Sequence, residues 1–164
     1  MSYKTIISAE DLKNNIDNND FIVFDCRCDI SDSSYGRSAY NDGHIQNSIF
    51  IDVDHDLASE KTVDSGRHPL PDPEILSEKL SQWGMNSSKQ VVVYDDAGGA
   101  FASRMWWIFK WLGHTNVAVL DGALGAWMSS GGKLTSKTTI FERSSFTPKI
   151  HDDLHVSLKE VEEA

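Results

Sequence analysis

Residues 91–104 read VVVYDDAGGAFASR, and this stretch decides the fold. The apolar run that ends at Asp95 is typical of a strand buried on both faces of a parallel sheet. Gly98 and Gly99 then predict a turn, and residues 100–112 are apolar nearly all round, which predicts a buried helix that Gly113 ends. A strand, a glycine-bearing loop and a helix in this order indicate an α/β fold.

Three further runs repeat the strand pattern of this stretch. Residues 21–25 (FIVFD), 48–52 (SIFID) and 117–121 (VAVLD) are apolar and end at an aspartate, and a fifth strand is expected near residues 5–7. Helices are predicted at 8–15, 73–84 and 123–128. The sequence therefore predicts an open α/β sandwich with a mainly parallel five-stranded sheet and helices on both faces. Ligands usually bind at the carboxyl edge of such a sheet.

Composition limits the classes of function. The 164 residues suit one domain, and 40% hydrophobic with 24% charged residues is a globular composition. A net charge of -10, with no cluster of basic residues, disfavours nucleic-acid binding. The sequence contains neither an apolar run of about 20 residues nor a signal peptide, so a cytoplasmic domain without a membrane partner is expected.

The turn after residues 91–95 is the natural place for a site. A loop that leads into a helix N-terminus presents backbone N–H groups to an anion. Here Asp95 and Asp96 would occupy or repel that position. We therefore predict a loop whose anion chemistry has been removed, formed by Asp95, Asp96, Gly98, Gly99 and Arg104.

Metal and redox sites are not favoured by the remaining motifs. Asp52, Asp54 and Asp56 alternate as in a calcium loop, but the required glycine and closing glutamate are absent. Cys26 and Cys28 supply only two ligands and no disulfide framework. We expect Cys26 to be a packed thiol, whereas Cys28 could carry a minor thiol activity at the ligand-facing edge. No metal and no cofactor are predicted.

Five segments together resemble the N-terminal domain of two-domain rhodanese-type sulfurtransferases, the 3-mercaptopyruvate/thiosulfate sulfurtransferase family. They are Asp-Cys-Arg at 25–27, GRSAYNDGHIQNSIF at 36–50, GRHPLPDP at 66–73, the stretch 91–114, and 121–132 with its Asp-Gly-Ala start. They occur in the family's order between residue 5 and about residue 135. The resemblance implies a rhodanese-like open sandwich.

This resemblance also implies where sulfur chemistry takes place. In the family, a cysteine directly after a strand carries a persulfide, and the matching position here is Asp95. The chain alone is therefore expected to be inactive, as a non-catalytic domain over residues 1–145. Residues 146–164 would form a linker and the start of an absent C-terminal catalytic domain, which takes sulfur from a small-molecule donor and passes it to cyanide or thiols.

Further roles follow from the same resemblance. His68 and Asp54 match a pair that assists the catalytic loop of the mercaptopyruvate branch as a supporting relay, although His68 could instead only cap a loop. Phe101 and Trp106 are expected at the domain interface, so the isolated chain could self-associate through them. The alternative function is a non-catalytic rhodanese module that binds or regulates a partner.

Overall fold

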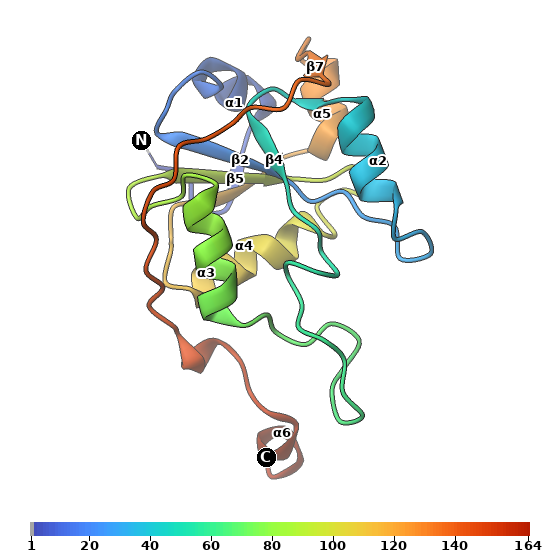
Figure 1. The fold of residues 1–164 in the computed structure, drawn as a ribbon, viewed down its shortest axis with the longest axis vertical. Helices are drawn as coiled ribbons and strands as arrows, with labels where there is room; N and C mark the ends of the chain where they lie inside the picture. The colour runs from blue at the N-terminus through green and yellow to red at the C-terminus, as the bar shows by residue number, and fades with distance from the viewer. Residues whose placement is uncertain (1) are drawn as a thin grey trace.

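A computed structural model describes residues 2–164 and places a parallel sheet at the centre of the molecule (Figure 1). Its strand order is β1-β6-β5-β2-β4, and every neighbouring pair is parallel. The five strands are β1 (Ile6–Ile7), β2 (Phe21–Asp25), β4 (Ser48–Phe50), β5 (Gln90–Tyr94) and β6 (Val117–Leu120). The predicted α/β sandwich with five parallel strands is confirmed.

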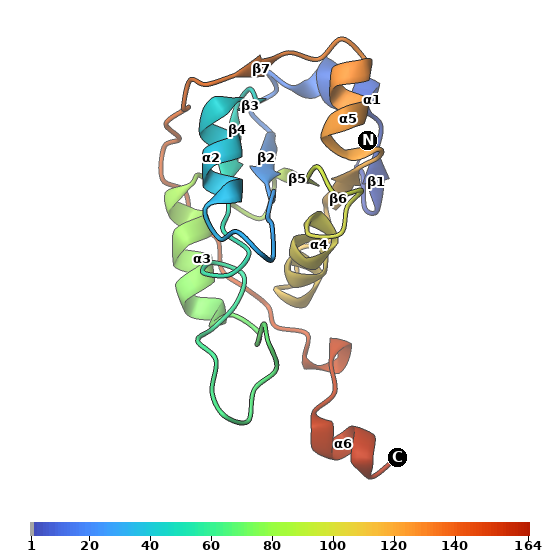
Figure 2. The same cartoon turned by 90° about the vertical axis from the view of Figure 1, so that its right-hand side faces the viewer.

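Helices cover both faces of the sheet (Figures 1 and 2). Helices α1 (Ala9–Asn15) and α5 (Ala123–Ser129) bury apolar residues against one face, and α3 (Pro73–Gln82) and α4 (Ala102–Trp111) against the other. Within β2, Phe24 packs in the α3/α4 core while its neighbour Val23 packs in the α1/α5 core. Because successive side chains alternate between two covered faces, each strand is apolar throughout.

Side-chain caps fix two of these helices where the sequence suggests. The Ser8 hydroxyl accepts the backbone N–H of Asp11 at the start of α1. Asp72 accepts the N–H groups of the next turn at the start of α3, and Pro73 needs no such acceptor. These caps satisfy donors that the helices leave unpaired and so set where both helices begin.

Between residues 2 and 145, three elements lie outside the predicted ones. Helix α2 (Tyr35–Asp42) lies beside β4, where the Tyr40 hydroxyl donates to the Ser48 carbonyl at 2.8 Å. Strands β3 (His44–Ile45) and β7 (Leu134–Thr135) form a separate antiparallel pair. Only Gly36 and Tyr40 of α2 are buried, so the helix has little apolar periodicity by which the sequence could indicate it.

The C-terminal segment packs along the domain beyond residue 145. Phe146 is buried against Phe109 in the α3/α4 core, and the Lys149 N–H donates to the Leu112 carbonyl at 2.9 Å. The chain then passes through a 3-10 turn, Asp152–Leu154, into α6 (Leu158–Glu162), which stands apart from the other elements in Figure 2. The assignment of residues 146–164 to a further domain stays a prediction.

The C-terminal helix begins as its sequence indicates. The Ser157 hydroxyl accepts the N–H of Glu160, and the Glu160 carboxylate accepts the N–H of Ser157, which together form a capping box. All side chains of this helix are exposed. None of the helices in residues 2–164 has the length and apolar character required to cross a membrane.

Candidate functional site

The carboxyl edge of the sheet carries two groups of predicted site residues. One is the loop that follows β5 and leads into α4, with Asp95 at its start. The other consists of the two segments around Asp54 and His68, which connect β4 to α3. Both lie at the edge where parallel α/β sheets usually bind ligands.

The Asp95 carboxylate fills the centre of its own loop. Its Oδ1 accepts the N–H groups of Ala97 at 2.9 Å and Gly99 at 2.8 Å. Its Oδ2 accepts those of Phe101 at 2.8 Å and Ala102 at 2.9 Å, the latter the first residue of α4. The side chain has no exposed surface. Four N–H groups that could bind an external anion are therefore engaged by a built-in one.

Two glycines allow the loop to turn its N–H groups inward. Gly98 and Gly99 have φ angles of 67° and 91°, in the left-handed region that residues with a side chain rarely adopt. A loop of this kind, with successive N–H groups converging before a helix, is the general form of an anion-binding turn. The backbone of such a site is thus present, and only the group at its centre is unusual.

The second acid, Asp96, points away from these N–H groups. It is exposed, and its carboxylate accepts a hydrogen bond from the hydroxyl of Tyr35 at the start of α2. This bond, followed by burial and the charge of Asp96, raises the pKa of Tyr35. Asp96 therefore adds negative charge outside the loop and does not fill it.

His68 and Asp54 lie in direct contact although 14 positions separate them in the sequence. The His68 Nε2 is 2.6 Å from the Asp54 Oδ1, and the two side chains are 28% and 37% exposed. Because a carboxylate can only accept, Nε2 is the donor in this bond. Nδ1 of His68 has no hydrogen-bond partner within residues 2–164. The two residues of the predicted pair are thus in contact, through one ring nitrogen of His68.

Arg104, predicted to belong to the Asp95 loop, reaches instead toward the His68 segment. Its Nη2 donates to the carbonyl oxygens of Leu57 at 2.7 Å, His68 at 3.1 Å and Pro69 at 3.3 Å, and its Nε donates to Leu57 at 3.1 Å. The guanidinium thus joins both segments that flank the His68–Asp54 contact.

A search against protein-family models matches residues 8–130 to the rhodanese-like domain. The chain belongs to this family. A probable 3-mercaptopyruvate sulfurtransferase from Pseudomonas aeruginosa is 44% identical over 139 residues, which cover 83% of this chain and 49% of that protein. A putative thiosulfate sulfurtransferase, SseB, from Mycobacterium tuberculosis is 33% identical over 153 residues, 93% of this chain and 53% of that one.

Solved structures agree with this rhodanese-like fold. SseA from Escherichia coli, a 3-mercaptopyruvate sulfotransferase, superposes with a TM-score of 0.87 at 24% identity and covers 99% of this chain and 62% of its own. A 3-mercaptopyruvate sulfurtransferase from Leishmania major gives a TM-score of 0.80 at 24% identity, over 88% of this chain and 40% of that one. The chain spans about half the length of the curated relatives it matches.

The two thiols of this rhodanese-like domain are not poised to react. Cys26 is fully buried, with its Sγ 3.5 Å from the Met105 Sδ, and burial raises its pKa well above the usual value. The pKa of the half-buried Cys28 is raised to about 11, mainly by burial and then by the negative charges of Asp54, Asp52 and Asp29. Since the thiolate is the nucleophile, this environment argues against a thiol activity of Cys28.

A buried charge network at the end of β2 is a feature that the sequence reasoning did not single out. Asp25 has no exposed surface, and its Oδ2 accepts hydrogen bonds from the Arg27 Nη2 at 2.7 Å and the Tyr94 hydroxyl at 2.6 Å. The only sequence signal was the Asp-Cys-Arg segment of the family resemblance. Because Asp25 neutralises Arg27, this arginine is not available to bind an anionic ligand.

The two predicted interface residues are both partly exposed. Phe101 and Trp106 both pack against the α3/α4 core. The Trp106 Nε1 donates to the Lys4 carbonyl at 3.0 Å, and the Lys110 ammonium lies 5.1 Å from the Trp106 ring centre. Trp106 therefore has partners inside this domain, and its contact with a second domain stays a prediction.

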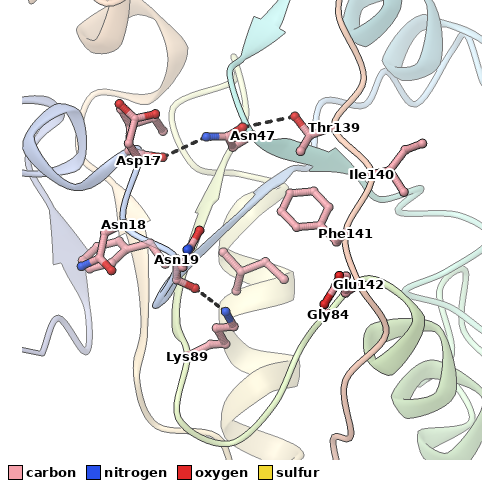
Figure 3. A pocket seen from close by; sticks show the side chains of 13 residues that line it. Asp17, Asn18, Asn19, Asn47, Gly84, Lys89, Thr139, Ile140, Phe141 and Glu142 are labelled. Atoms are coloured by element: carbon pink, nitrogen blue, oxygen red, sulfur yellow. Dashed lines mark hydrogen bonds between the residues drawn. The ribbon is translucent and has the colours of Figure 1, made fainter.

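A cavity of about 410 Å³ lies at the opposite edge of the sheet (Figure 3). Its wall combines the turn before β2, Lys89 before β5 and the returning C-terminal segment, where the Thr139 hydroxyl donates to Asn47 at 3.2 Å. It shares no residue with the Asp95 loop or the His68–Asp54 pair. Residues 2–164 contain no group of three or more potential metal ligands.

Proposed function

We propose that this chain is the N-terminal domain of a sulfurtransferase and assists sulfur transfer without carrying the sulfur. The observation that carries the proposal is the Asp95 carboxylate, which occupies the N–H groups of the loop where the family resemblance places a cysteine. An oxygen of this carboxylate cannot form the sulfur–sulfur bond of a persulfide. The loop therefore keeps the family's shape without its nucleophile.

The sulfur-carrying cysteine would belong to a second rhodanese domain that follows residues 146–164. Its thiolate would take the outer sulfur of thiosulfate and release sulfite, or the sulfur of 3-mercaptopyruvate and release pyruvate after a proton is added to carbon. Cyanide or a thiol would then remove that sulfur and restore the thiolate. Relatives about twice as long as the region they share with this chain support a second domain.

The free thiols Cys26 and Cys28 support a cytoplasmic location.

The His68–Asp54 pair would face the catalytic loop of that second domain. Asp54 holds the Nε2–H of His68, so Nδ1 remains free to accept a proton. In the mercaptopyruvate branch of the family this nitrogen would take the proton of a catalytic-loop hydroxyl. A 2.6 Å contact between two half-exposed side chains supports this relay more than a loop-capping role, in which a backbone group would be the partner.

The test compares this chain alone with a hybrid protein. The hybrid joins this chain to the C-terminal half of the Pseudomonas aeruginosa relative in place of that protein's own N-terminal half. Thiocyanate formation is measured with thiosulfate and with 3-mercaptopyruvate. We expect no turnover above the free-thiol background from the chain alone, turnover from the hybrid, and a drop of about 10²-fold in the hybrid on His68→Gln with mercaptopyruvate.

Two results would contradict the proposal. Turnover by the isolated chain would place a sulfur carrier within residues 1–164. A folded hybrid that gains no activity from this chain would instead favour the alternative, a non-catalytic rhodanese module that binds or regulates a partner. The filled Asp95 loop is compatible with that second function, because it needs no nucleophile.

A further inference from the structure

We propose that Arg104 and Lys79 are positioning residues, which set His68 and Asp54 against each other from within this domain. The catalytic value of this positioning rests on the relay proposed above. The positioning itself concerns only residues 2–164 and can be tested without turnover.

Arg104 fixes the segment that carries His68. Arg104 lies in the first turn of α4, and its guanidinium donates to the carbonyl oxygens of His68 and Pro69 as well as to that of Leu57. Leu57 is fully buried and closes the turn that contains Asp54. One planar group with several donors therefore joins the two segments at a fixed separation.

The surroundings of Arg104 suit this role. The guanidinium is half-buried, makes no ion pair within residues 2–164, and is satisfied by carbonyl oxygens. Burial lowers its pKa, which reflects the cost of removing the charge from water without a carboxylate nearby. A shorter side chain with fewer donors, such as glutamine, could not reach all of these carbonyl groups and would leave some of them without donors.

Lys79 fixes the segment that carries Asp54. Its ammonium on α3 donates to the Asp56 Oδ1 at 2.5 Å, and the Asp56 Oδ2 accepts the N–H of Asp52 at 2.9 Å. The Asp52 carboxylate in turn accepts the N–H of Asp54 at 2.9 Å. The turn that presents Asp54 is thus tied to α3 by a chain of charged hydrogen bonds.

The two positioning residues come from neighbouring helices of one face. Helices α3 and α4 bury their apolar sides in the same core, so Lys79 and Arg104 are held at a constant distance. The intervening residues 60–64 are exposed and supply no such restraint. The Ser59 N–H also joins the two segments, by donating to the Pro69 carbonyl at 3.3 Å, but it holds neither His68 nor Asp54 itself. Without the two cations, more of the ordering of the pair would fall on substrate binding, and that ordering opposes catalysis.

The test observes the His68 Nε2–H by NMR on the isolated chain, labelled with ¹⁵N in its histidines. A ring N–H bonded to a carboxylate exchanges slowly enough with water to be seen, whereas an exposed one exchanges too fast. His68→Gln assigns the signal among the six histidines, and Asp54→Asn shows its dependence on the contact. We expect Arg104→Gln and Lys79→Gln each to remove the signal while the amide spectrum keeps its native dispersion.

Arg143→Gln is the matched control, because Arg143 makes a two-bond pair with Glu78 on the exposed side of α3. It should leave the His68 signal unchanged. If Arg104→Gln does not fold, Arg104→Lys and the partly exposed Lys79→Gln still test the proposal. A His68 signal that persists in a folded variant of either residue overturns the role of that residue.

The hybrid protein separates this proposal from the relay. If Arg104 acts through His68, Arg104→Gln and His68→Gln should each lower kcat, and the double variant should be no slower than His68→Gln alone. If the NMR signal is lost but His68→Gln leaves hybrid turnover unchanged, the positioning stands and the relay fails. If the fold-reduction in kcat of the double variant equals the product of the two single fold-reductions, Arg104 does not act through His68.

Discussion

The Asp95 loop and the His68–Asp54 pair lie at the same edge of the sheet, and they differ in whether a polar atom is left unpaired. The Asp95 carboxylate is buried and accepts four N–H groups of its own loop. His68 is 28% exposed, and its Nδ1 has no partner within residues 2–164. Four N–H groups of the region with the shape of an anion site are thus engaged from within, whereas in the less regular region one ring nitrogen has no partner among the described residues.

This difference shows that backbone geometry and chemical competence are separable. A strand, a glycine turn and a helix N-terminus build a site for an anion, and the side chain at the first position decides whether that anion comes from outside. Here one carboxylate makes the loop a structural element. Substitutions that empty the loop, and measurements of the reactive groups near the pair, therefore test whether the two regions differ in this way.

The largest effect is expected from Asp95→Ala. This substitution leaves four N–H groups of the loop, one of them buried and three partly buried, without the acceptor that they have here, and we expect the free energy of unfolding to fall by about 3 kcal/mol. Asp95→Asn keeps one acceptor oxygen but turns an NH2 donor toward the other two N–H groups, so it should also lower the free energy of unfolding, by about 2 kcal/mol or more. Urea unfolding followed by circular dichroism measures both.

Asp96→Ala is the control for this experiment, because Asp96 is exposed and its carboxylate bonds, within residues 2–164, only to the Tyr35 hydroxyl. Its unfolding free energy should stay within about 0.5 kcal/mol of the unsubstituted chain. Equal stability of Asp95→Ala and Asp96→Ala would mean that the loop does not depend on its central carboxylate.

Much of the fold could be predicted because both faces of the sheet are covered. Runs such as FIVFD at β2 are apolar throughout, which is a strong local signal. Helix α2 could not be predicted, because its residues YGRSAYND are mostly polar and its N-cap Ser34 makes no side-chain hydrogen bond. Its position comes from tertiary contacts, such as the stacking of Tyr40 on His44, which leave no periodic pattern in the sequence.

In the candidate site too, some contacts could be predicted from local sequence and others could not. The two acids after β5 are adjacent in sequence, and strand–loop–helix chemistry alone was enough to predict that a carboxylate could occupy the loop. The contact between His68 and Asp54 joins two irregular segments, and only the family resemblance indicated it. The contacts of Arg104 with backbone carbonyls were not predicted, because a carbonyl acceptor carries no residue-type signal.

A second effect, about 100-fold, is expected for the reactivity of Cys28, the thiol beside the His68–Asp54 pair. Its pKa is raised from 9.0 to about 11, so the protonated form is favoured in the folded chain. At pH 8 the thiolate fraction, and with it the rate of alkylation by iodoacetamide, should be about 100-fold lower than in the unfolded chain. The rate should rise about tenfold per pH unit up to that pKa.

A Cys26→Ala variant makes Cys28 the only thiol and isolates its rate. The unfolded reference is the same variant in urea. Alkylation of the folded variant at the unfolded rate at pH 8 would show that the acids and burial do not suppress the thiolate. A thiol activity of Cys28 at this edge would then have to be considered again.

The smallest effect is expected at the contact between Tyr35 and Asp96, which joins the outside of the Asp95 loop to α2. The hydrogen bond and charge of Asp96 raise the pKa of Tyr35, so the protonated phenol is favoured in the folded chain. Its contribution to stability is present below the ordinary tyrosine pKa and is lost as the pH rises through the raised value. Asp96→Asn should therefore shift the Tyr35 titration to lower pH, with little change in stability near pH 7.

Phenolate absorbance against pH measures this shift. The same titration is carried out in Tyr35→Phe, with and without Asp96→Asn. It gives the absorbance change of the other three tyrosines, which is subtracted to leave that of Tyr35. If Asp96→Asn leaves the Tyr35 titration in place, the carboxylate does not accept the phenol hydrogen in solution. The placing of Asp96 outside the loop would then lose its support. A shift confined to Tyr35 would instead show that Asp96 is held by α2 and not by the loop N–H groups.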